Sequence, residues 1–106
     1  VRCAEATYAA GDVRRNASQC HGLAGNGELF LEMKRIFGGG WQARAEEFGA
    51  LAAAYKEGAG PVDKWRSDEP GQYSPDFMTG AAGTGHFFLR LARPESVSMP
   101  LMLRPE

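Results

Sequence analysis

The chain has 106 residues, a length that allows one small domain. Twelve basic and thirteen acidic residues give a net charge of -1, which excludes a basic surface for a nucleic acid or an anionic membrane. No apolar run approaches the ~20 residues that span a bilayer, so we expect no transmembrane segment. The chain opens on Val1 without a signal-peptide pattern, and we therefore predict a cytoplasmic piece of a longer protein.

The first predicted helix covers residues 1–10, which contain no helix-breaking residue. Gly11 ends it, since glycine commonly follows the last turn of a helix. Cys3 lies in this helix and Cys20 in the loop that follows. Two cysteines without a secretion signal do not indicate a disulfide framework, so they either bind metal or have no special role.

Residues 20–27 read Cys-His-Gly-Leu-Ala-Gly-Asn-Gly and place two potential metal ligands side by side. Zinc accepts sulfur and nitrogen donors, so Cys20 and His21 are candidates for half of a zinc site at the start of a helix. The alternative is a buried thiol beside a histidine that caps the helix. The dipeptide alone favours this alternative, because adjacent Cys-His pairs are common by chance.

Two helices joined by glycines are predicted next. Residues 23–37 carry apolar side chains at helical spacing, and Glu28 lies outside their apolar face. Three glycines at residues 38–40 end this helix, and residues 41–56 form the second one. Helices with so short a connection are predicted to pack antiparallel. The apolar faces consist of Leu23, Leu29, Phe30, Met33, Ile36 and Phe37 in the first helix, and of Trp41, Ala45, Phe48, Leu51, Ala52 and Tyr55 in the second.

Glycines and prolines interrupt residues 57–75, and we expect an irregular segment there. Trp65 and Tyr73 lie in this segment. Aromatic side chains in an irregular segment either fasten it to the core or line a pocket. The first interpretation is the preferred one.

A second glycine-rich segment begins at Gly80 and opens the last predicted helix, which ends at Leu91. It repeats the pattern at Gly22 with a separation of 58 residues, 80 minus 22. The chain therefore predicts an internal repeat of a helix-hairpin unit in an all-α, stacked or toroidal architecture. Pro94 prevents the last helix from continuing, and residues 99–103 form an apolar tail that we expect to fold back on the helices.

Both glycine segments resemble the two C-terminal motifs of the lanthionine synthetase C-like (LanC-like) family. The first motif corresponds to residues 20–26 and the second to residues 76–91. The resemblance covers essentially the whole chain and implies an all-α fold, the C-terminal fragment of an α/α toroid. In that fold the inner helices, here residues 23–37 and 80–91, begin at Gly-x-x-Gly turns, and outer helices such as residues 41–56 return between them.

The family holds zinc with an adjacent Cys-His pair and one further cysteine from the preceding repeat. The resemblance therefore implies that Cys20 and His21 are zinc ligands and that the third ligand lies before Val1. It also implies that residues 1–106 form the C-terminal portion of a LanC-like cyclase domain. Cys3 lies only seventeen residues before Cys20, 20 minus 3, on a predicted outer helix, so we expect an ordinary buried residue there.

The family's activity, as the resemblance implies, is the zinc-dependent addition of a peptide cysteine thiol to dehydroalanine or dehydrobutyrine, which closes a thioether ring. Zinc makes the thiolate available at neutral pH. The implied partners are a precursor peptide containing Ser, Thr and Cys, and a fused or associated dehydratase. Two alternatives remain. One is a zinc-containing member of the fold that binds glutathione-like thiols, and the other is an inactive fragment too short to close the toroid.

A fragment of a toroid leaves inner helices without neighbours on one side. We therefore expect an exposed apolar surface, chiefly from Leu29, Phe30, Phe87 and Phe88. His86 lies just inside the last predicted helix. We expect a packing histidine there, and the alternative is a side chain that lines the pocket.

Overall fold

The structure, a computed structural model, describes residues 1–13, 15–58, 63–67, 69 and 71–100. Within these ranges the chain forms four helices and no strand, which confirms the predicted all-α class. The helices are α1 (Arg2–Ala10), α2 (Leu23–Phe37), α3 (Trp41–Ala54) and α4 (Ala81–Ala92). The predicted α3 is two residues too long, and α4 begins one residue later than predicted. None of the helices in the described part is long and apolar enough to cross a membrane.

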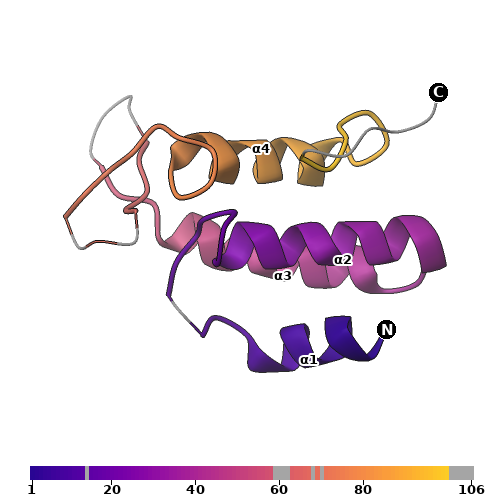
Figure 1. Cartoon of the computed structure of the whole chain (residues 1–106). Coiled ribbons are helices and arrows are strands. Elements are labelled where there is room, and N and C mark those ends of the chain that lie inside the picture. The colour runs from indigo at the N-terminus through magenta and orange to yellow at the C-terminus, as the bar shows by residue number, and fades with distance from the viewer. Residues whose placement is uncertain (14, 59–62, 68, 70, 101–106) are drawn as a thin grey trace.

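Helices α2 and α3 form the predicted antiparallel hairpin, with α1 on one side of it and α4 on the other (Figure 1). Gly38 ends α2 with φ 69°, a left-handed backbone that favours glycine. Helices α2 and α4 run in the same direction, and α1 and α3 run in the opposite one (Figure 1). Both helices that follow a glycine segment therefore begin at the same end of the molecule.

Aromatic rings form the centre of the core. Phe30 of α2 is fully buried, and its ring centroid lies 4.9 Å from that of Phe48 in an edge-to-face contact. Trp41 stacks on Phe30 at 5.9 Å, so α2 and α3 are joined mainly through these rings. The buried core consists of Ala17, Leu23, Ala24, Phe30, Leu31, Ala45, Phe48, Ala52 and Phe87.

The predicted exposed apolar surface is wrong for Phe30 and Phe87, which are both fully buried. Leu29 and Phe88 are half-buried and pack against the core. The reason is that Phe30 packs against Trp41 and Phe48 of α3. Phe87 of α4 lies against α2 at Gly27, where no side chain separates the two helices. Three residues assigned to apolar faces are exposed instead, Ile36, Phe37 and Leu51.

The segment after α3 is fastened to the core by Trp65. Its indole Nε1 donates a hydrogen bond to the Ala52 carbonyl at 2.8 Å, and its ring lies 5.7 Å from that of Phe88. Tyr73 is 43% exposed, and its hydroxyl donates to Glu57. The preferred interpretation, a fastened segment, therefore holds for Trp65 and not for Tyr73.

The described part of the segment after α4 returns to the helices. The Arg90 Nε donates to the Val97 carbonyl at 3.1 Å, and the His86 Nε2 lies 3.1 Å from the Ser98 carbonyl oxygen. His86 also meets Phe77 edge to face at 5.6 Å, as a packing histidine does. Residues 101–103 of the predicted apolar tail lie outside the described residues.

Gly27 and Gly85 occupy equivalent positions of α2 and α4, 85 minus 27 being 58, but differ in the space around them. A Cβ at Gly27 would come within 3.0 Å of the Phe87 ring, whereas one at Gly85 meets nothing within 4 Å. Gly27→Ala should lower the free energy of unfolding by about 1 to 3 kcal/mol through overpacking. Gly85→Ala should raise it by about 0.5 to 1 kcal/mol, because alanine favours a helix interior. Urea unfolding of both variants measures the difference, and effects of the same sign would contradict it.

Candidate metal centre

The two loops that lead into α2 and α4 have the same backbone geometry. Gly22 precedes α2 with φ −125° and ψ −164°, and Gly80 precedes α4 with φ −123° and ψ −163°. The amide after Gly22 donates to the Asn16 carbonyl at 2.8 Å, and the amide after Gly80 donates to the Ser74 carbonyl at 2.9 Å. The internal repeat predicted from the sequence is therefore present in the hydrogen bonds of the backbone.

The extended backbone conformation of Gly22 and Gly80 is open to any residue, so it does not require glycine. These positions are glycine because there is no room for a side chain. A Cβ at Gly22 would come within 3.0 Å of the Asn16 carbonyl oxygen, and one at Gly25 equally close to that of Gln19. Gly80 and Gly83 meet the carbonyls of the second loop in the same way. The missing side chains let each loop lie directly against the start of its helix.

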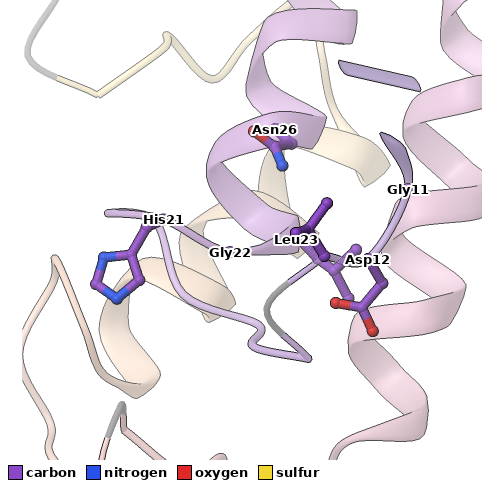
Figure 2. A pocket seen from close by; sticks show the side chains of 7 residues that line it. Gly11, Asp12, His21, Gly22, Leu23 and Asn26 are labelled. Carbon is purple, nitrogen blue, oxygen red and sulfur yellow. The ribbon is translucent and has the colours of Figure 1, made fainter. Parts of the chain in front are cut away.

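Cys20 and His21 lie side by side in the turn before α2. Cys20 is exposed, which argues against the alternative of a buried thiol. His21 is half-buried and lines a pocket of about 240 Å³ (Figure 2). Figure 2 shows its ring pointing away from Asp12 and Asn26. The other lining residues are Gly11, Asp12, Val13, Gly22, Leu23 and Asn26.

Asp12 gives this pocket a carboxylate, which is not among the predicted site residues. Its Oδ2 accepts a hydrogen bond from the Tyr55 hydroxyl at the end of α3. That bond raises the pKa of the Tyr55 hydroxyl above its ordinary value. In the sequence Asp12 reads only as a loop residue after a helix-ending glycine, and nothing in the pattern links it to Tyr55.

Among the described residues, no group of three His, Cys, Asp or Glu side chains is placed to hold a metal ion. Cys20 and His21 offer two donors, a sulfur and an imidazole nitrogen, and this pair fits the chemistry of zinc. Cys3 is exposed on α1, whose only buried residue is Ala4. The prediction of a buried Cys3 is therefore wrong, because this residue lies on the solvent side of its helix.

The second glycine loop holds the first one in place. The Cys20 amide donates to the Met78 carbonyl at 2.8 Å, a contact between equivalent positions of the repeat, since 78 minus 20 is 58. The Thr84 hydroxyl, which is buried, donates to the Ala17 carbonyl at 3.2 Å. The second loop itself has Met78 and Thr79 where the first has Cys20 and His21, so only the first loop carries a thiol beside an imidazole.

Residues 1–104 match the family described as lanthionine synthetase C-like protein. The chain belongs to the lanthionine synthetase C-like family. This confirms the resemblance carried by the two glycine motifs. No solved structure matches the chain.

In this LanC-like chain a buried ion pair joins α2 and α4. Glu28 and Arg90 are each 1% exposed, and the guanidinium donates to the Glu28 carboxylate and, at 2.8 Å, to the Glu32 Oε1. Burial raises the pKa of Glu28, and the hydrogen bond from Gln19 and the charge of Arg90 oppose this rise. Glu28 was expected outside the apolar face, yet this LanC-like chain buries it, because Arg90 of α4 provides a charged partner.

Proposed function

We propose that residues 1–106 are the C-terminal portion of a zinc-dependent lanthionine synthetase. In this proposal Cys20 and His21 supply two of the zinc ligands, and the third comes from outside the described residues, in the preceding repeat. The observation that carries the proposal is the exposed Cys20 thiol next to His21 at a glycine-led helix start, in a chain of this family. The parallel course of α2 and α4 supports their assignment as inner helices of a toroid, with α3 outside.

The proposed reaction joins two side chains of a precursor peptide. The sulfur of a cysteine forms a bond to the β carbon of dehydroalanine or dehydrobutyrine, the carbon–carbon double bond becomes single, and the α carbon takes up a proton. Bound zinc supplies a thiolate at neutral pH. Cys20 serves as a thiolate ligand and His21 as a neutral imidazole, while Asp12 and Asn26 offer polar groups to the peptide in the adjacent pocket.

The partners in this proposal are the precursor peptide and a fused or associated dehydratase that prepares it. A cytoplasmic location belongs to the same proposal. The second candidate is a LanC-like protein that binds zinc and glutathione-type thiols without closing rings, and the third is an inactive fragment. The exposure of Cys20 favours a thiol-binding role in either of the first two cases.

Zinc content tests the metal site directly. After purification without chelator, the wild-type chain and Cys3→Ala should retain zinc, and Cys20→Ala should lose it, because only Cys20 has a neighbouring imidazole ligand. Plasma emission spectrometry measures the zinc per chain. Equal zinc in the wild-type chain and Cys20→Ala would contradict the assignment of Cys20.

The two thiol chemistries are separated by a second assay. A peptide that holds one cysteine and one dehydroalanine is incubated with the zinc-loaded chain, and its remaining free thiol is measured by alkylation and mass spectrometry. Loss of the alkylatable thiol supports the cyclase. Binding of glutathione by calorimetry without any thiol loss supports the binding protein instead.

A further inference from the structure

The side-chain amide of Gln19 joins the starts of α2 and α4. Its Nε2 donates to the Glu28 Oε1 at 3.1 Å and to the Gly83 carbonyl at 3.0 Å. Both amide hydrogens are therefore used, one on each helix. Gln19 directly precedes Cys20, so this side chain fixes the backbone next to the candidate zinc ligand.

Both acceptors of Gln19 are themselves held firmly. Glu28 is buried and paired with Arg90, which also donates from Nε to the Val97 carbonyl at 3.1 Å. Gly83 lies so close to the Gln19 side chain that a Cβ added at Gly83 would be 2.5 Å from the Gln19 Cγ. The position of the Gln19 side chain thus follows from the buried Glu28 carboxylate of α2, which is paired with Arg90, and from the absence of a side chain at Gly83 of α4.

The repeat shows that this polar connection is specific to the first loop. Phe77 is the equivalent of Gln19 and His86 the equivalent of Glu28, since 77 minus 19 and 86 minus 28 are both 58. In the second loop these two side chains also meet, as an aromatic contact at 5.6 Å. The two loops therefore have the same backbone geometry but different side-chain contacts. The loop that contains Cys20 and His21 has a hydrogen-bonded tether, and the other loop has an aromatic packing contact at the equivalent positions.

We propose that Gln19 is a positioning residue, which holds Cys20 in the orientation for metal binding through its tether to Glu28 and Gly83. The inference rests on the proposed zinc site for the role of Cys20, but the tether itself is independent of metal. The Cys20 amide, which donates to the Met78 carbonyl at 2.8 Å, reports on it directly. Residues that orient a metal ligand commonly contribute about 10-fold to 100-fold to metal affinity.

The test uses Gln19→Met, which keeps the length of the side chain and removes both donors, and Gln19→Asn, which keeps the donors but cannot reach both acceptors. Gln72→Met makes the same chemical change at an exposed position and is the matched control. Hydrogen exchange by NMR is measured at the Cys20 amide and at core amides of α3, without metal. Cobalt affinity and the thiolate-to-cobalt absorption band are measured in the same variants on a Cys3→Ala background.

In both Gln19 variants the Cys20 amide should exchange about 10-fold to 100-fold faster while α3 amides keep their protection, since each variant loses at least one of the two hydrogen bonds of the tether. Cobalt affinity should fall by a similar factor, and Gln72→Met should change neither. A uniform change of all amides, with the cobalt band unaltered, would overturn the proposal and leave Gln19 a purely structural residue. If the wild-type chain binds no cobalt, the zinc site fails, while selective loosening of the Cys20 amide still supports the tether.

Discussion

Arg90→Met should lower the free energy of unfolding by about 3 to 5 kcal/mol. The guanidinium of Arg90 is the charged partner of Glu28, and both residues are 1% exposed. Removing it leaves a buried carboxylate without a cation, which costs far more than the loss of an exposed pair. Urea unfolding followed by circular dichroism at pH 7 measures the change.

The decrease in the free energy of unfolding caused by Arg90→Met should become smaller as the pH falls toward 4.5, the ordinary pKa of a glutamate. Burial already raises the pKa of Glu28, and removal of Arg90 raises it further. A carboxyl whose pKa is raised on folding destabilises the folded state only when it is ionised. Stability is therefore lost as the pH rises through the pKa that the carboxyl has in the folded state. A deficit that grows on acidification would contradict this account.

Two controls separate the buried charge from the lost packing. The double variant Glu28→Met with Arg90→Met should recover most of the stability, because neither charge remains buried. Lys34→Met breaks the surface pair with Glu95 at 3.4 Å and should change stability by no more than about 0.5 kcal/mol. A double variant as unstable as Arg90→Met alone would assign the effect to packing.

Gly22→Ala should cost about 3 kcal/mol or more, which is large for the addition of one methyl group. The new Cβ would come within 3.0 Å of three backbone atoms, the carbonyl oxygen and carbon of Asn16 and the amide nitrogen of Ser18. Backbone atoms cannot relieve a clash by changing a rotamer, as a side chain can, so the whole loop before α2 must shift. Thermal unfolding measures the loss of stability.

Gly40→Ala is the matched control for Gly22→Ala. Gly40 precedes α3 with φ −78°, and a Cβ there meets nothing within 4 Å. Its replacement should lower stability by no more than about 1 kcal/mol, because alanine is a poorer N-cap than glycine. Similar losses in the two variants would show that conformational freedom, and not space, is what the glycine before α2 provides.

The helices could be predicted from the sequence because glycines mark their ends. The three glycines at residues 38–40 separate α2 from α3, and the spacing of Gly22 and Gly80 indicates the repeat that the backbone hydrogen bonds confirm. These signals are local. They depend on where a backbone turns and not on what a distant helix contributes.

The burial of single side chains could not be predicted in the same way. Glu28 reads as a solvent-facing residue until Arg90, 62 positions away, is known to lie beside it. Phe30 and Phe87 were expected at an open face, but Phe30 is covered by the rings of α3, and Phe87 of α4 packs against Gly27 of α2. Gln19 reads as an ordinary loop residue in the sequence, and its hydrogen bond to Glu28 is seen only in the structure.

The contact between the two glycine loops also sets the order in which this chain becomes structured. The α2–α3 hairpin depends on neighbouring residues, whereas the hydrogen bonds of Gln19 to Gly83 and of Thr84 to Ala17 span 64 and 67 positions. Contacts at such separation close a long loop and form late in folding. The segment that carries Cys20 and His21 therefore acquires its final shape only after α4 has docked. In the native state it is also the first to open when α4 detaches.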